Sequence, residues 1–407
     1  MTWSTVGDRA DELAEVKQYL RARGASDETV ERAAAQGVLG LLVTEYVLDP
    51  SGRRYTRSDM EELTGVGVDT LLRFWRALGF PDVEPTEKAF TDLDVEAITI
   101  LGQLLDTGLT DLDSAVQMAR VMGSCMTRIA EAELSMARDA VEHVDDLTQA
   151  RQLTAADESL VQSFARLLEY AWRRHLAAAT RRRMALRSQD RSGSPASGSL
   201  EMAVGFADMV GFTALSQQLS REELARVVTR FEDVAHGIVT ALGGRVVKMI
   251  GDEAMFVVED IEAAARMSLD LAEAYADDEL LSDVRIGLCV GPVLAMDGDY
   301  YGPVVNMASR MVNIANPGSV LVSDEVHARL KDSEELVWRS LKPRYLKDIG
   351  RVHMWAMMRL GRETSVAQRR LGERWQRIST NLTKDLGELR ERGERLLSTT
   401  DEHLSPS

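Results

Sequence analysis

The sequence predicts an α+β domain with a ferredoxin-like βαββαβ core, preceded by an all-α domain. Apolar residues recur at helical spacing through most of residues 1–190, as in "SLVQSFARLLEYAWRRHLAAATRRRMAL". From Leu200 the pattern changes to short apolar runs that alternate with amphipathic helices. Two of these runs are joined by Gly251 and Asp252, which indicates a β-hairpin. A chain of 407 residues is long enough to bury a separate core in each domain.

Composition divides the chain into four predicted segments. The helical domain covers residues 1–190, and "RSGSPASGS" at 191–199 is a linker by its glycine, serine and proline content. The α+β domain covers residues 200–360. Residues 361–407 form an amphipathic helical tail with leucines and a tryptophan on one face, which favours packing on the protein itself or a short dimer coil.

The charge and cysteine content narrow the class of protein. The net charge is −17, and the first 150 residues hold 28 acidic side chains against 14 basic ones. Such a surface repels a phosphate backbone, so no nucleic-acid partner is expected. Cys125 and Cys289 lie far apart, which excludes a disulfide framework and indicates a reducing compartment. Because neither a signal peptide nor a membrane span is recognisable, we expect a cytoplasmic protein.

The elements of the βαββαβ core occur in the order that this topology requires. A first strand ends at Asp208, and Ser220 with Glu223 forms a capping box that opens a helix. Gly243 and Gly244 end that helix, and the hairpin, a second helix and the strand "VRIGLCVG" follow. The predicted ranges are 203–207, 221–242, 246–250, 254–258, 260–276 and 284–291.

This topology brings two aspartates together. Its first and third strands are neighbours, so Asp208 at the end of the first strand and Asp252 in the hairpin are expected to face each other. Two carboxylates can hold a pair of magnesium ions roughly 3.5–4 Å apart for phosphoryl chemistry, together with substrate phosphates and water. The alternative is that aspartate simply favours turns and strand ends. The turn "MVGFT" adds backbone N–H groups, among them those of Phe212 and Thr213, as a cradle for a triphosphate.

Further polar residues stand in apolar surroundings. Lys248 lies inside the hairpin run "VVKMIGDEAMF", where a buried ammonium group is costly unless a ligand needs it. Asn306 and Arg310 are four residues apart on a predicted helix and therefore share one face. Their neighbours are mostly apolar, which favours a packed helix over two solvated polar residues. Asp299 lies in the loop before that helix.

Three motifs together resemble the catalytic domain of class III nucleotidyl cyclases. They are "FADMVGFT", "GGRVVKMIGDEAMF" and "DYYGPVVNMASRM", and they match in order and spacing across residues 200–360. The layout is similar to that of soluble bacterial adenylyl cyclases in which an N-terminal helical domain regulates the catalytic domain. The resemblance implies an enzyme that cyclises ATP by attack of the ribose 3′-hydroxyl on the α-phosphorus, releasing cyclic AMP and pyrophosphate.

The resemblance also implies a role for each polar residue. It implies two metal ions per active site, Mg²⁺ or Mn²⁺, and a homodimer in which each active site is shared by two copies of the chain. The implied roles are metal binding for Asp208 and Asp252, purine selection for Lys248 and Asp299, substrate contact for Phe212 and Thr213, ribose orientation for Asn306, and stabilisation of the α-phosphate charge for Arg310.

The pair of Lys248 and Asp299 favours ATP over GTP. Adenine offers an acceptor at N1 and a donor at its 6-amino group, which match a lysine donor and an aspartate acceptor. Guanine presents the reverse pattern, and each buried polar group left unpaired costs about 1–3 kcal/mol. Lys347, in "YLKDIG", is a further candidate for triphosphate contact, although a lone lysine near a strand is more often solvated.

The helical region supports a second hypothesis. "RRYTRSDMEELTGVGVDTLLRFWRALGFPD" resembles the helix-turn-helix of MerR-type regulators, with a capping box at Ser58 and Glu61, a turn through Gly65 and Gly67, and a second helix at 71–78. The second helix offers only two arginines, Arg73 and Arg76, to a nucleic acid. A packing unit used for regulation is therefore the favoured interpretation. The alternative function is a nucleotide-binding signalling module, or a DNA-linked regulator with a catalytically silent cyclase fold.

Two hypotheses address the regulatory signal. Histidine is the residue type that most readily senses pH, and His143 and His175 lie in the helical region, so control by pH is one hypothesis and control by a small molecule is another.

Overall fold

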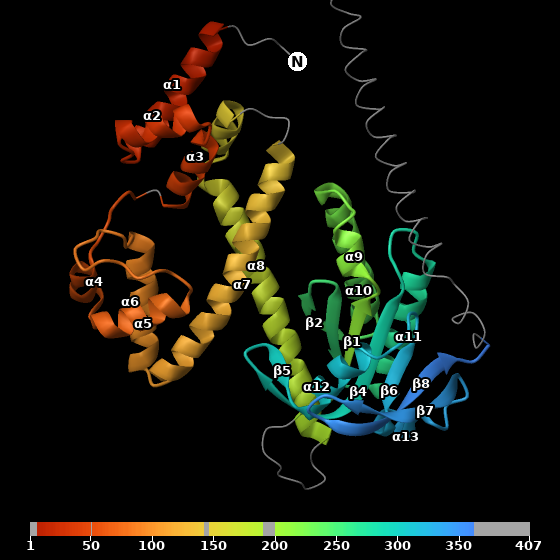
Figure 1. The fold of residues 1–407 in the computed structure, drawn as a ribbon. Coiled ribbons are helices and arrows are strands. Elements are labelled where there is room, and N and C mark those ends of the chain that lie inside the picture. Colours follow the sequence, from red (N-terminus) through yellow and green to blue (C-terminus); the bar gives the residue numbers. More distant parts are fainter. Residues whose placement is uncertain (1–5, 50, 142–145, 190–199, 362–407) are drawn as a thin grey trace, which may run out of the picture. The chain divides into compact units, whose positions relative to one another are not determined.

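The computed structural model describes residues 6–49, 51–141, 146–189 and 200–361 (Figure 1). The chain divides into two units, Met1–Ser194 and Pro195–Ser407. The predicted linker at 191–199 and residues 362–407 of the predicted tail lie outside the described residues.

The N-terminal unit is all-α, as predicted. One group of buried side chains joins the first three helices to the start of the eighth, and a second group joins the fourth, fifth and sixth. None of the described helices, including the 44-residue α8, is apolar over enough of its length to cross a membrane. The helices are α1 (Val6–Ala22), α2 (Asp27–Gln36), α3 (Leu39–Leu48), α4 (Arg57–Thr64), α5 (Val68–Ala77), α6 (Asp92–Asp106), α7 (Leu112–Val141) and α8 (Asp146–Gln189).

Helices α4 and α5 form the predicted helix-turn-helix, but the start of α4 was predicted wrongly. The helix begins at Arg57, and its capping box consists of Thr56 and Asp59 in place of Ser58 and Glu61. The Thr56 hydroxyl accepts a hydrogen bond from the Asp59 N–H at 3.2 Å, and the Asp59 carboxylate accepts one from the Thr56 N–H at 2.8 Å. Both pairs of residues fit the capping pattern in sequence, and the one nearer the N-terminus opens the helix.

The C-terminal unit is built on one mixed sheet with the strand order β2-β3-β1-β4-β6-β8-β7, and β5 pairs with β4 outside that order (Figure 1). The first four strands and the two long helices between them form the predicted βαββαβ core. The elements are β1 (Leu200–Met209), α9 (Phe212–Ser216), α10 (Arg221–Ala241), β2 (Arg245–Ile250), β3 (Glu253–Val258), α11 (Ile261–Asp277), β4 (Val284–Met296), β5 (Asp299–Tyr301), α12 (Pro303–Val312), β6 (Val320–Ser323), α13 (Asp324–Leu330), β7 (Leu336–Leu346) and β8 (Gly350–Arg359).

Side chains alternate between the two faces of the sheet, and each face has its own core. Ala203 and Ala207 of β1 pack with α10 and α11 on one face. Val204 and Phe206 of the same strand pack with α12 on the other face. Asp208 continues the second series, so its side chain belongs to the face that α12 covers.

Helix α12 lies very close to β4 because Gly287 has no side chain. A Cβ atom at this position would lie 2.4 Å from the carbonyl oxygen of Ala308 and 3.0 Å from the backbone nitrogen of Val312. Both atoms belong to the backbone of the helix, so a larger residue would have to displace the helix itself.

We predict that Gly287→Ala lowers the free energy of unfolding by about 1–3 kcal/mol, because overpacking against backbone cannot be relieved by a rotamer change. Chemical denaturation of the full-length chain measures the effect. Gly237→Ala is the matched control: Gly237 lies in α10 with nothing within 4 Å of its added Cβ, so this change should raise stability by about 0.5–1 kcal/mol. Equal effects of the two changes would contradict the close approach.

Candidate active site

Strand pairing places Asp208 and Asp252 next to each other. Asp208 is opposite Glu253 in the antiparallel pairing of β1 with β3, and Asp252 is the residue just before Glu253. The next N–H of β1, that of Met209, donates a hydrogen bond to the Asp252 carbonyl oxygen at 3.0 Å. The turn that carries Asp252 is therefore attached to the end of β1. This attachment holds the Asp252 carboxylate close enough to Asp208 for their charges to interact.

A row of three charged side chains crosses the sheet at this point. Asp208 is opposite Glu253 on one side and opposite Arg285 of β4 on the other. The Arg285 guanidinium donates a hydrogen bond to the Asp208 carboxylate, and the side chains are 27% and 15% exposed. Within the described residues, Arg285 Nε and Glu253 Oε1 are buried without a hydrogen-bond partner.

Burial and the closeness of the carboxyl groups to one another raise the pKa values of Asp252 and Glu253. Burial raises the pKa of Asp252, and the charge of Asp208 raises it further, against a backbone hydrogen bond and Arg285. Burial raises the pKa of Glu253 to about 7, and the charges of Asp208 and Asp252 act in the same direction. Arg285, with a weaker contribution from Lys248, thus faces three acidic groups, and the site has a deficit of positive charge.

This donor set fits a divalent cation. Oxygen ligands with an excess of negative charge suit Mg²⁺ or Mn²⁺. In the described parts of the chain, no group of three or more His, Cys, Asp or Glu side chains is arranged to hold a metal by itself. Mg²⁺ is usually held by one or two carboxylates plus substrate phosphates and water, so a pair of aspartates is enough when a polyphosphate completes the shell.

Lys248 and Asp299 lie side by side, on β2 and β5. Lys248 Nζ donates a hydrogen bond to Asp299 Oδ2, and the N–H of Tyr300 donates one to Asp299 Oδ1 at 2.8 Å. The expectation that Lys248 is buried is wrong: its side chain is 36% exposed, because β2 is the edge strand of the sheet. An ammonium group has three donors, so Lys248 retains donors for another acceptor beside Asp299.

Asn306 and Arg310 lie on α12, as the sequence predicts, and both are exposed. The helix buries Val304, Ala308 and Met311 against the sheet, which leaves the two polar side chains on its outer surface. The Arg310 guanidinium lies 3.9 Å from the carboxylate of Asp348. Asp348 belongs to the turn between β7 and β8, which also contains Lys347. In the described residues, no hydrogen bond or ion pair joins the Arg310 guanidinium to Asp208 or Asp252.

Phe212 and Thr213 are the first two residues of α9, directly after the turn that follows β1. Gly211 precedes them with a φ of 75°, a conformation that glycine adopts without strain. The first residues of this short helix therefore lie just after the end of the strand that carries Asp208. Phe212 also packs its ring against the core under α10 and α11.

Four residues near these groups were missed from the sequence: Arg285, Glu253, Arg245 and Tyr300. Arg285 gives the same pattern as Lys248, a cation inside an apolar strand, and could have been found in that way. Glu253 follows Asp252 directly in "GDEAMF". Arg245 and Tyr300 are 55 residues apart and make a hydrogen bond that no local pattern indicates.

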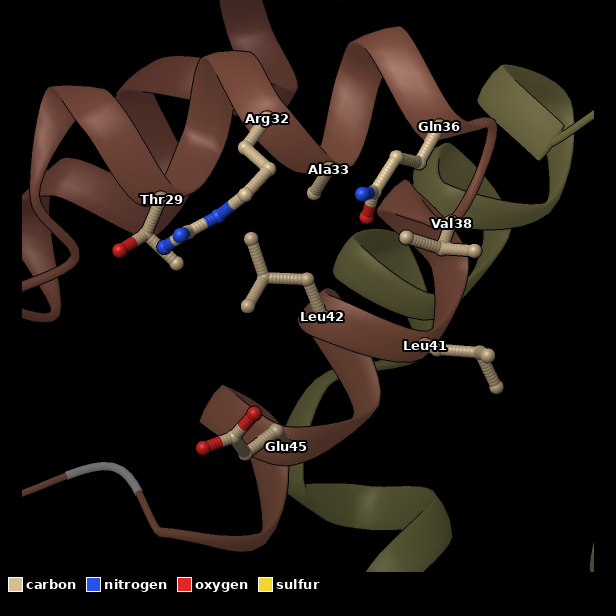
Figure 2. A pocket seen from close by; sticks show the side chains of 8 residues that line it. All are labelled: Thr29, Arg32, Ala33, Gln36, Val38, Leu41, Leu42 and Glu45. Carbon is tan, nitrogen blue, oxygen red and sulfur yellow. The ribbon is translucent and has the colours of Figure 1, made fainter.

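The N-terminal unit holds a separate hollow of about 300 Å³ between α2 and α3. Figure 2 shows Arg32 and Glu45 on either side of the Leu42 side chain, with Val38 and Leu41 further along the wall. One cation and one anion over an apolar floor do not match a polyphosphate, so the nucleotide chemistry belongs to the other unit.

The arginines and histidines that the sequence singled out in the N-terminal unit form ion pairs, are exposed or lie outside the described residues. Arg73 pairs with Asp113, and Arg76 pairs with Asp82, so both arginines of the predicted DNA-reading helix already have carboxylate partners. His175 is exposed on α8, and His143 lies outside the described residues.

Comparisons with known proteins identify the family of each part of the chain. Residues 196–359 match the family described as adenylate and guanylate cyclase catalytic domain, and residues 6–184 match the adenylate cyclase regulatory domain. The chain is 36% identical over 272 residues to an adenylate cyclase of Streptomyces coelicolor, covering 66% of this chain and 70% of that protein. It is 35% identical over 285 residues to an adenylate cyclase of Glutamicibacter nicotianae, with the same two coverages. It is 33% identical over 321 residues to an adenylate cyclase of Streptomyces griseus, covering 78% of each.

The fold and the matched catalytic domain define a nucleotidyl cyclase, in which a helical regulatory domain precedes the catalytic one. Within that class, the chain belongs to the adenylate cyclase family. It is an enzyme that forms cyclic AMP from ATP, and its resemblance to class III cyclases, stated above from three motifs, is confirmed.

We predict that Glu253→Gln alters the pH dependence of stability in the metal-free enzyme. Because the pKa of Glu253 is raised from 4.5 to about 7, the stability that its proton provides is fully present below pH 4.5 and is lost as pH rises through about 7. Relative to the wild type, the variant should gain about 1–3 kcal/mol of unfolding free energy across that window. Denaturant titration in EDTA measures it.

The exposed Glu259, at the end of the same strand, provides the control. Glu259→Gln should leave the pH dependence of the wild type unchanged. If the free energy of unfolding of Glu253→Gln changed with pH in parallel with that of the wild type, the burial and crowding of the Glu253 carboxyl group would be contradicted.

Proposed function

We propose that ATP is cyclised at the carboxylate row of β1, β3 and β4, in a site completed by a second copy of the chain. The single observation that supports this best is the charge deficit around Asp208, where three acidic groups face Arg285 and, more weakly, Lys248. A magnesium or manganese complex of ATP supplies both the missing cations and the phosphate oxygens that would complete their coordination.

Asp208 and Asp252 would hold two cations, which when bound supply the charge that favours an ionised 3′-hydroxyl and a departing pyrophosphate. Arg285 donates a hydrogen bond to Asp208. Its planar group of donors is also well suited to a phosphate oxygen, so Arg285 would contact the polyphosphate beside the cations that Asp208 would hold. The N–H groups of Phe212 and Thr213 would contact the same polyphosphate.

Lys248 and Asp299 would select the purine. Their hydrogen bond to each other places a donor and an acceptor side by side, and adenine N1 and its 6-amino group can replace each partner. The same edge of guanine would present a donor to Lys248 and an acceptor to Asp299, which leaves both unpaired. A preference for ATP over GTP would follow from this pair.

Asn306 and Arg310 would act on the ATP held by the other subunit, Asn306 by orienting the ribose and Arg310 by stabilising charge on the α-phosphate. Their exposure on α12, without a link to Asp208 in the described residues, supports a site shared between two subunits. Arg310 would act mainly in the transition state, so its loss should lower kcat more than it raises KM.

The helical domain would regulate the enzyme by changing how the two catalytic domains meet, because a shift of a few ångströms removes Arg310 from its partner's site. The signal, whether pH or a small molecule, stays a hypothesis. The paired arginines of the helix-turn-helix support a packing role over DNA binding.

We predict that Asp252→Ala and Arg310→Ala each abolish cyclic AMP formation, and that mixing the two variants restores part of it. A mixed dimer has one site with both changes and one site with neither. Random pairing would then return about a quarter of the wild-type rate. The assay follows cyclic AMP formed from ATP with Mn²⁺ or Mg²⁺ by the purified full-length chain.

The control is a mixture of Asp252→Ala with Asp208→Ala. Both residues belong to the same half of the proposed site, so no combination of these subunits contains an intact one, and activity should stay absent. Failure of the first mixture to recover, when mixed dimers are shown to form, would contradict sites shared between subunits.

A further inference from the structure

The strand that carries Asp299 has little support from the sheet. β5 has only three residues, and it pairs with β4 alone, outside the main strand order. Figure 1 shows the β4–β5 hairpin extending beyond the body of the sheet. Two-stranded hairpins of this kind are marginally stable without further contacts. The position of the Asp299 acceptor relative to Lys248 therefore depends on what else holds β5 to β2.

In the described residues, two side-chain contacts join β2 to β5. The first is the hydrogen bond between Lys248 and Asp299 themselves. The second is three residues earlier on β2, where Arg245 donates a hydrogen bond to the Tyr300 hydroxyl at 2.9 Å. The central carbon of the Arg245 guanidinium lies 5.2 Å from the centre of the Tyr300 ring, within the range of a cation–π contact.

A purine bound between Lys248 and Asp299 would compete with the first contact, because the base would pair with both side chains. The contact between Arg245 and Tyr300 is a second polar link between β2 and β5, and the base would leave it intact. It is well placed for this, because the Tyr300 ring packs against the core under α12. Arg245, by contrast, is exposed on the edge strand. The hydroxyl thus links an exposed side chain of the edge strand β2 to a ring of β5 that is packed against the core.

We propose that Arg245 and Tyr300 are positioning residues for purine selection: they hold β2 and β5 at the spacing that lets Lys248 and Asp299 pair with adenine at the same time. This inference rests on the proposed role of Lys248 and Asp299. Neither Arg245 nor Tyr300 needs to touch the nucleotide. Tyr300 also acts through its backbone, since its N–H fixes one oxygen of Asp299 and leaves the other for a ligand.

Loss of the Arg245–Tyr300 contact would affect discrimination between ATP and GTP more than the chemical step. If the spacing between β2 and β5 were no longer fixed, adenine could still pair with either Lys248 or Asp299, and a small movement of β5 would relieve the mismatch with guanine. Affinity for ATP would fall, inhibition by GTP would strengthen relative to it, and the rate of the bound complex would change less.

The test compares Tyr300→Phe with Tyr301→Phe in the full-length enzyme. Tyr301 is the next residue of the same strand, is 46% exposed, and makes no side-chain hydrogen bond in the described part of the chain. Each change removes one hydroxyl and keeps the ring. The readouts are KM for ATP, kcat, and the inhibition constant of GTP against cyclic AMP formation.

We expect Tyr300→Phe to lower the ratio of the GTP inhibition constant to KM for ATP by about two- to tenfold, the range for loss of one hydrogen bond. Arg245→Gln should give a similar loss, and the double variant should lose no more than either single one, because both changes break the same contact. Tyr301→Phe should match the wild type. The midpoint of thermal unfolding should be the same for Tyr300→Phe and Tyr301→Phe.

The inference is overturned if Tyr300→Phe and Tyr301→Phe have the same ratio, or if Tyr300→Phe lowers kcat with the ratio intact. Lys248→Ala and Asp299→Ala separate this from failure of the proposed function. If those two variants lose discrimination between ATP and GTP while Tyr300→Phe does not, only the proposed positioning role of Arg245 and Tyr300 is wrong. If they discriminate like the wild type, the proposed purine site is wrong as well.

Discussion

The pairing of β1 with β3 and β4 is the constraint on which the catalytic unit depends. It places Asp208 between Glu253 and Arg285, and it fastens the turn containing Asp252 to the end of β1. Burial, together with the like charges held this close, raises the pKa values of Asp252 and Glu253, a cost that the fold accepts. Such perturbed pKa values are common where a site is organised for a charged ligand in advance. A metal–polyphosphate complex would relieve the repulsion that the strand register creates.

The other groups are arranged around this row by the two faces of the sheet. Helix α12 covers the face to which Asp208 belongs, and its close approach at Gly287 fixes the surface from which Asn306 and Arg310 project. Lys248 and Asp299, the pair proposed to select the purine, lie instead at an edge, on β2 and the short β5, where the sheet gives the least support. The acidic row thus lies in the centre of the sheet, and the proposed base-selecting pair lies at its edge.

The topology and the catalytic motifs could be predicted because their signals are local. Strand lengths, the Gly251–Asp252 hairpin and the capping box at Ser220 all lie within a few residues, and the βαββαβ order follows from them. The burial of Lys248 was predicted wrongly because an apolar run does not show whether its strand is central or at an edge. The capping box of α4 was misplaced because two overlapping patterns compete. Arg285 has the same local signal as Lys248, but its pairing with Asp208 depends on strand order, as does the Arg245–Tyr300 contact, and local sequence does not give strand order.

The most direct test of this account is a crystal of the full-length enzyme with Mn²⁺ and 3′-deoxy-ATP, which lacks the attacking hydroxyl and cannot be cyclised. Anomalous scattering then locates the metal ions. The account predicts two peaks roughly 3.5–4 Å apart, both in contact with the carboxylates of Asp208 and Asp252, and Arg285 turned away from Asp208. Manganese bound only to the triphosphate, with Arg285 still paired to Asp208, would contradict it.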